Sequence, residues 1–181
     1  EAEVKRVPDI NRAYGDVYRV AGDLAARNYR FQDAVALTRQ AVALDPYNSK
    51  AHGDLGMHLM RTGEEPEARR SLDKAFSLDA YDVVTYNLLS LLDTLDKFVV
   101  EKSGDLIVKF HPDEAQIMRE YALPLAHEAL KALSSRYQFT PQGPILIEIF
   151  PTHDDFAVRN LGLPGMIGAL GACFGRVVTM D

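Results

Sequence analysis

Small and apolar residues recur at helical spacing through the first half of the chain, and their pattern repeats every 34 residues. Identical residues stand at this offset in several pairs: Gly22 and Gly56, Ala34 and Ala68, Ala41 and Ala75, Leu44 and Leu78, Asp45 and Asp79, Tyr47 and Tyr81. A third copy begins with Tyr86 in the place of Tyr18. Such a fixed period predicts an array of similar structural units.

Each unit is predicted to fold as two antiparallel helices. The first helix of the array is expected over residues 9–27, from Asp9, with turns near residues 28–30 and at Thr62-Gly63. Gly22 and Gly56 fall within helices, where glycine costs about 1 kcal/mol relative to alanine. A neighbouring helix is therefore expected to approach closely at both glycines. Pro46 closes the first unit, because proline disfavours helix in the residue before it.

The combination of Ala21-Gly22, Ala34, Ala41 and Pro46, repeated as Leu55-Gly56, Ala68, Ala75 and Ala80, resembles the tetratricopeptide repeat. The resemblance implies a helical array over residues 15–97, with units at 15–48 and 49–82, a partial third unit at 83–97 and an extension at 1–14. The sequence departs from the family pattern at Ala25, where a large aromatic residue is usual, and at Ala80, which replaces the closing proline. Such arrays bind proteins or peptides, so a polypeptide partner is implied.

In tetratricopeptide arrays the first helices of successive units line a concave groove. The resemblance places the following residues on that face: Asp16, Arg19, Asp23, Lys50, Met57, Met60, Arg61, Asn87 and Leu91. Met57 and Met60 would be adaptable apolar contacts for a peptide, and Lys50 and Arg61 would bind acidic groups. The alternative is that this face packs against the second half of the same chain.

From residue 98 onward the pattern predicts strands as well as helices. Residues 98–101 and 106–110 form a predicted hairpin, followed by a long helix that opens at Pro112. The apolar stripe of this helix is expected to comprise Ile117, Met118, Tyr121, Leu125, Ala129, Leu133 and Tyr137. A strand at 145–150, a short helix capped by Thr152 and a strand at 175–180 follow. The predicted fold class is therefore α plus α/β, with a helical hairpin array followed by a small α+β segment at 98–181.

The order of these elements is similar to the first half of a peptidase-MA-like (gluzincin) zinc metallopeptidase domain. The resemblance is carried by Phe110-His111-Pro112, by residues 145–151 leading to Phe156, and by the glycine-rich run at 168–172. Such enzymes place His-Glu-x-x-His on one helix, where two imidazoles bind zinc and the Glu activates water. In this chain the His-Glu pair is His127-Glu128, and Lys131 stands where the second histidine is required.

The resemblance also implies a substrate-binding strand and a continuation of the chain. In the family, the strand nearest the cleft aligns the substrate backbone, a role that would fall to Gly168, Ala169, Leu170, Gly171 and Ala172; a glycine-rich structural turn is the alternative. The zinc motif would follow shortly after Asp181, so residues 98–181 are interpreted as a segment truncated before it. No metal or cofactor is predicted for this chain itself, although the full-length protein could bind zinc.

The amino-acid composition limits which classes of binding partner are expected. The net charge is −6 and no run of Lys or Arg occurs, so the positive surface that nucleic acid requires is not expected. The weakly charged stretch at 161–175 is too short and too rich in glycine to span a membrane. Cys173 is the single cysteine and is interpreted as a small buried residue, and His52 and His58 as ordinary helix residues. These features leave the cellular compartment open.

Three hypotheses for function follow from the sequence. The first is a protein-binding module attached to a non-catalytic, metallopeptidase-like segment. The second is a fragment of a zinc metallopeptidase whose His-Glu-x-x-His helix lies beyond residue 181. The third is a structural scaffold in which the α/β segment caps the helical array.

Overall fold

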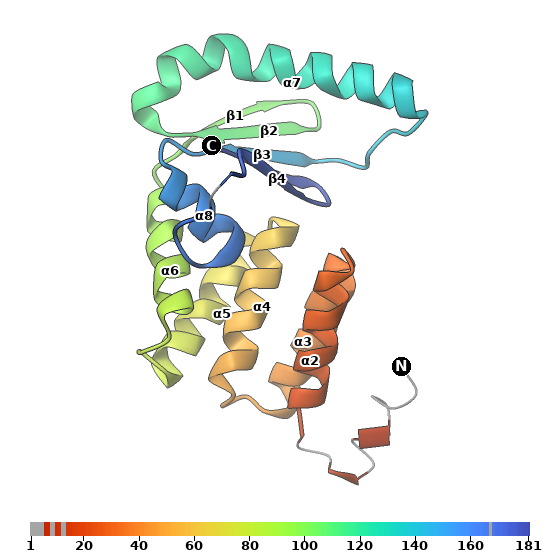
Figure 1. Ribbon diagram of the computed structural model, residues 1–181, viewed down its shortest axis with the longest axis vertical. Coiled ribbons are helices and arrows are strands. Elements are labelled where there is room, and N and C mark those ends of the chain that lie inside the picture. Colours follow the sequence, from red (N-terminus) through yellow and green to blue (C-terminus); the bar gives the residue numbers. More distant parts are fainter. Residues whose placement is uncertain (1–5, 8–9, 12–13, 167) are drawn as a thin grey trace. The chain divides into compact units, whose positions relative to one another are not determined.

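The computed structural model describes residues 6–7, 10–11, 14–166 and 168–181 (Figure 1). The chain divides into two compact units, residues 1–90 and 91–181. An array of helices is followed by a small mixed sheet with a long helix, which confirms the predicted fold class. Within the described ranges, none of the helices has the length and apolar character needed to cross a membrane.

The helices of the first unit form antiparallel pairs, α2 (Asp16–Arg27) with α3 (Phe31–Leu44), and α4 (Ser49–Thr62) with α5 (Glu65–Leu78). Helix α4 also packs against α3 and α2, which joins one pair to the next. A further helix, α6 (Val83–Leu95), begins in this unit at the place of the partial third repeat. The first helix was predicted to begin near Asp9, which lies outside the described residues, and α2 begins at Asp16.

Local sequence explains where α4 and α5 begin and end. The side chain of Asn48 caps α4 by accepting a hydrogen bond from the backbone N–H of Ala51 at 3.0 Å. Gly63 ends α4 with φ of 79°, in the left-handed region that glycine adopts without steric cost. Pro66 lies in the first turn of α5, where its missing N–H needs no partner. The turns predicted at 28–30 and 62–63 are confirmed.

The repeated glycines allow the two helices of each pair to approach closely. A methyl group added at Gly22 would lie 2.4 Å from Oγ1 of Thr38 and 3.2 Å from the carbonyl oxygen of Ala34. A methyl group added at Gly56 would lie 2.5 Å from Cγ of Leu72. The distances of 2.4 Å and 2.5 Å are far below ordinary van der Waals contact. The close approach predicted at both glycines is therefore confirmed.

The described part of the second unit forms a five-stranded mixed sheet in the order β1-β2-β3-β5-β4. Its strands are β1 (Val99–Ser103), β2 (Leu106–Phe110), β3 (Ile145–Ile149), β4 (Gly171–Phe174) and β5 (Val177–Met180). Strands β2, β3 and β5 are parallel neighbours, and the antiparallel strands β1 and β4 form the edges. The short 3-10 helix η1 (Pro112–Glu114) and α7 (Ala115–Tyr137) connect β2 to β3, and α8 (His153–Leu161) follows β3.

Helices cover both faces of this sheet, with α7 along one face and α8 on the other (Figure 1). Val108 and Phe110 form the core beneath α7 together with Ala115, and Met118 and Ala122 of α7 pack against them. The prediction for the apolar stripe of α7 was wrong in large part, because these members are exposed: Ile117, Tyr121, Leu125, Leu133 and Tyr137. At 3.6 residues per turn, residues 115, 118 and 122 share one side of the helix, and that side faces the sheet.

The sequence predicted one strand at 175–180, whereas the structure contains a hairpin of β4 and β5 that turns at Gly175 and Arg176. Gly171 and Ala172 have low strand propensity, so pairing with β5 determines their conformation. Cys173 was interpreted as buried, which was wrong: it is exposed on edge strand β4. Its thiol donates to the carbonyl oxygen of Gly175 at 3.3 Å, and burial of part of the side chain raises its pKa.

Candidate functional site

The predicted groove residues differ in how much surface they offer. Arg19 and Asp23 of α2 are half-buried, and Met57, Arg61 and Asn87 are half-buried on α4 and α6. Lys50 is exposed at the start of α4. Met60 and Leu91 are buried, with 0% and 2% of their surface exposed, so neither presents a side chain to a peptide in this structure. Peptide binding by these residues stays a prediction.

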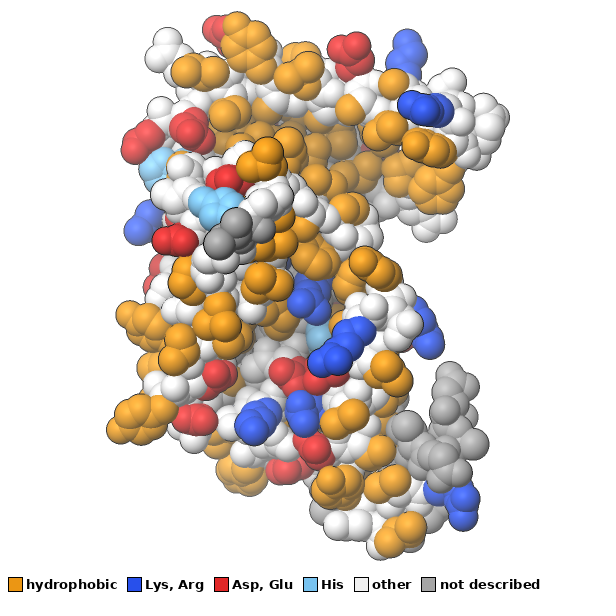
Figure 2. Space-filling view, in the orientation of Figure 1, with side chains coloured by type: hydrophobic (Ala, Val, Ile, Leu, Met, Phe, Trp, Pro, Cys, Tyr) orange, Lys and Arg blue, Asp and Glu red, His pale blue; other side chains and the backbone are white. Residues whose placement is uncertain are grey.

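A charged cluster joins α2 to α4. The guanidinium of Arg19 contacts the carboxylate of Asp16, and its Nη1 lies 3.0 Å from Oδ2 of Asp54 and 3.5 Å from Oδ2 of Asp23. His58 lies next to Asp23, so the cluster comprises Asp16, Arg19, Asp23, Asp54 and His58, and it is called the seam cluster below. Figure 2 shows charged side chains of both signs gathered where α2 and α4 lie. The cluster connects the first helices of two successive helix pairs, α2–α3 and α4–α5.

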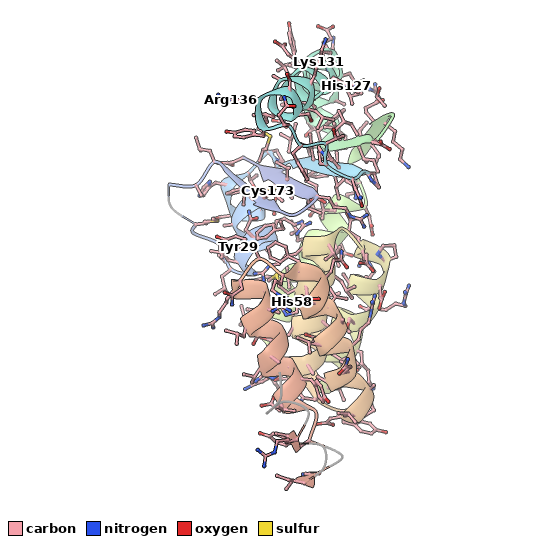
Figure 3. The ribbon with its side chains drawn as sticks, turned by 90° about the vertical axis from the view of Figure 1, so that its right-hand side faces the viewer. Tyr29, His58, His127, Lys131, Arg136 and Cys173 are labelled. Atoms are coloured by element: carbon pink, nitrogen blue, oxygen red, sulfur yellow. The ribbon has the colours of Figure 1, made fainter. Side chains whose placement is uncertain are left out.

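His58 lies beneath the exposed part of the seam cluster. Its side chain is 4% exposed, and its Nε2 lies 3.5 Å from Oδ1 of Asp23, longer than an ordinary hydrogen bond. Neither ring nitrogen has a hydrogen-bond partner among the residues that the structure describes. In Figure 3 His58 lies within the helical array. The interpretation of His58 as an ordinary helix residue missed this position.

The carboxylates of the seam cluster differ in how their charge is compensated. The nearby imidazole of His58 lowers the pKa of Asp23, aided by the charges of Arg19 and Arg27. Burial raises the pKa of Asp54, and the nearby charge of Asp23 raises it further, despite the contact with Arg19. Hydrogen bonding to Asp16 raises the pKa of Arg19, which therefore stays charged. Burial therefore outweighs the contact with Arg19 at Asp54.

The sequence identified Arg19 and Asp23 but missed Asp54 and His58. Asp54 and His58 are four residues apart on α4, so they lie on one side of that helix. This spacing could have indicated that the two side chains lie close together. Their proximity to α2 depends on how α2 and α4 pack, which the spacing alone does not determine.

A second candidate surface is the outer edge of β4, which is the last strand of the sheet among the described residues. Strand β4 pairs on one side with β5, and at its start the backbone N–H of Asp181 donates to the carbonyl oxygen of Leu170. Because pairing alternates along an antiparallel ladder, Gly171 and Cys173 direct their backbone groups to the unpaired edge. Of the predicted substrate-aligning residues, Gly171 and Ala172 lie in this strand, whereas Gly168, Ala169 and Leu170 precede it.

His127 and His153 of the second unit make separate contacts. His127 is exposed on α7, its Nε2 lies 2.9 Å from Oγ of Ser103, and Lys131 follows one turn later (Figure 3). His153 is engaged elsewhere, between Asp181 at 2.7 Å and the carbonyl oxygen of Met166 at 2.5 Å. Over the described residues, no group of three or more His, Cys, Asp or Glu side chains is arranged to hold a metal ion.

Comparison with known families finds a match, which lies within the first unit. Residues 25–82 match the family model for the tetratricopeptide repeat, and the helices within this range form a repeat-like array. No curated protein matches the chain. The family match and the arrangement of the helices agree with the resemblance seen in the sequence, and they support a protein–protein interaction module.

Proposed function

We propose that this chain binds a polypeptide partner along α2 and α4, the first helices of two successive repeat units. The proposal is carried by the seam cluster, in which partly exposed charged side chains from both helices lie side by side. Charged groups at a recognition surface fix the register and orientation of a partner. The tetratricopeptide match at residues 25–82 supports a partner that is a protein or peptide.

The proposal is tested by selecting binders from a random peptide library displayed on phage, with the purified chain as bait. Selected peptides are synthesised with a fluorescent label, and their affinities are measured by anisotropy. We expect Lys50→Glu, which reverses an exposed charge on α4 one turn before Asp54, to change the affinity at least threefold, whereas the matched control Lys74→Glu on α5 leaves it unchanged. The proposal fails when no peptide is selected, or when both lysine variants bind every selected peptide like the wild type.

A second candidate function concerns residues 98–181, which would be the front part of a metallopeptidase-like domain. The observation that favours it is the edge strand β4, whose free backbone groups at Gly171 and Cys173 are suited to pair with an extended peptide. Lys131 replaces the second histidine of the His-Glu-x-x-His motif at His127. In this candidate function, other residues would therefore have to bind the zinc ion. Reading the gene beyond the codon for Asp181 tests this candidate: a His-Glu-x-x-His motif supports it, and a stop codon removes it.

A further inference from the structure

The seam cluster brings the carboxylates of Asp23 on α2 and Asp54 on α4 close to one nitrogen atom of Arg19. Nη1 of Arg19 lies 3.0 Å from Asp54 and 3.5 Å from Asp23, so both carboxylates converge on the same small volume. Their side chains remain 32% and 36% exposed, and that of Asp16 is 35% exposed. A group arriving from solvent can therefore reach the cluster without displacing a helix.

The charges in this volume are not balanced. Arg19 provides one guanidinium for the carboxylates of Asp16, Asp23 and Asp54, and Arg27 adds only a weaker attraction for Asp23. His58 attracts both Asp23 and Asp54 when it carries a proton. Burial, followed by the nearby charge of Asp23, raises the pKa of Asp54. An additional cation would relieve the repulsion between the carboxylates, and an additional anion would increase it.

Below the carboxylates lies a buried polar group without a hydrogen-bond partner. Both ring nitrogens of His58 lack such a partner among the described residues, and Nε2 faces Asp23. An imidazole in this position responds to any change in the charge or position of Asp23. Its signals in an NMR spectrum therefore report whether a charged group reaches the cluster.

We propose that the polypeptide bound by this array places an arginine or lysine side chain beside Arg19, against the exposed parts of the Asp23 and Asp54 side chains. The inference rests on the proposed peptide-binding function and specifies the chemistry of the partner. Arginine suits the place well, because its planar guanidinium can donate to two carboxylates at once. This reading differs from the sequence-based expectation that Lys50 and Arg61 select acidic groups, because the convergent side chains at the seam are carboxylates.

The experiment uses the peptides selected from the random library. We expect every tight binder to contain Arg or Lys, and replacement of that residue by citrulline or norleucine, respectively, to weaken binding to the wild type at least tenfold. On Asp54→Asn, the charged and neutral peptides should bind alike. On Asp54→Glu the preference for the charged peptide should persist, and on Asp73→Asn, at an exposed position of α5, it should equal that of the wild type. Thermal unfolding followed by circular dichroism establishes that each variant is folded.

NMR spectra supply a second readout that a merely structural effect would not produce. The imidazole signals of His58 should shift on addition of the charged peptide and remain in place with its neutral analogue. Selected peptides that bind without Arg or Lys, or charged and neutral peptides of equal affinity on the wild type, overturn the inference while peptide binding itself stands. A library that yields no binder overturns the proposed function, and the inference with it.

Discussion

Arg159 of α8 donates from Nε to Oε2 of Glu148 in β3 at 2.6 Å, and both side chains are fully buried. Moving two charges out of water is unfavourable, and their attraction offsets that penalty only while both are present. Asn160, the next residue of α8, accepts a hydrogen bond from Thr179 of β5 at 2.9 Å. Helix α8 is therefore bound to the sheet through polar contacts that depend on one another.

Loss of either charge should strongly destabilise the second unit. We expect Glu148→Gln or Arg159→Met to lower the free energy of unfolding by about 3–5 kcal/mol, because each removes one charge of a fully buried ion pair. The double variant Glu148→Leu/Arg159→Met should lose less than either single variant. Urea titration followed by NMR signals of β3 and α8 measures these changes. Single-variant losses below about 1 kcal/mol would show that the pair is dispensable.

The helical array could be predicted from the sequence because its determinants are local and repeated. Gly22 and Gly56 mark where helices approach, and Pro66 and Gly63 mark where they begin and end. Such signals follow from steric properties of single residues. The pairing of α2 with α3 and of α4 with α5 could therefore be inferred without coordinates.

The remaining features depend on partners that are distant in the sequence. Gly171 and Ala172 form a strand only because β5 pairs with them, and the turn at Gly175 follows from that pairing. Asp54 belongs to the candidate binding site because it contacts Arg19, which lies 35 residues earlier in the sequence. The sheet determines which side of α7 is buried. Apolar residues occur on more than one side of this helix, so the sequence alone could not identify the buried side.

The contact between Gly56 and Leu72 makes a sharp prediction about the array. Gly56→Ala should lower the free energy of unfolding by about 1–3 kcal/mol through overpacking, despite a gain of about 1 kcal/mol in helix propensity. The added methyl group would lie 2.5 Å from Cγ of Leu72 and must displace it. In a Leu72→Ala background the cost of Gly56→Ala should disappear, as measured by a double-mutant cycle in urea. Equal costs in both backgrounds would contradict the steric explanation.

His153 should anchor the glycine-rich loop in a manner that depends on pH. Its Nδ1 and Nε2 face the carboxylate of Asp181 and the carbonyl oxygen of Met166, which only accept hydrogen bonds, so both nitrogens carry protons. The contact with Asp181, followed by that with Met166, raises the pKa of His153. The stabilisation is therefore complete below the ordinary histidine pKa of about 6.5 and is lost as pH rises through the raised value.

The measurement is an NMR titration of His153 combined with hydrogen exchange of residues 162–166 and 168–170. We expect Asp181→Asn to lower the pKa of His153, and exchange in the loop to accelerate at high pH beyond the intrinsic base-catalysed increase. His127 of α7, which contacts Ser103 of β1, provides an internal control, because Asp181→Asn should leave its NMR signals in place. If Asp181→Asn does not alter the titration of His153, the proposed role of the contact between His153 and Asp181 is contradicted.

The raised pKa of Asp54 predicts how stability of the array varies with pH. Burial, followed by repulsion from Asp23, makes the folded state hold the Asp54 proton more tightly than the unfolded state. The resulting stabilisation is complete below the ordinary aspartate pKa of about 3.9 and is lost as pH rises through the raised value. Asparagine does not titrate, so the stability of Asp54→Asn relative to the wild type should improve over the same range. Urea denaturation at several pH values measures this difference, with Asp73→Asn as the matched control.

The same linkage connects stability to recognition at the seam cluster. A basic peptide side chain beside Asp54 favours its charged form, so a bound peptide should lower the pKa of Asp54. By linkage, affinity for an Arg-containing peptide should increase as pH rises through the titration of Asp54, and affinity for its citrulline analogue should not. Anisotropy titrations on the wild type and Asp54→Asn distinguish the two cases. Parallel pH profiles for both peptides on the wild type would place the peptide charge away from Asp54.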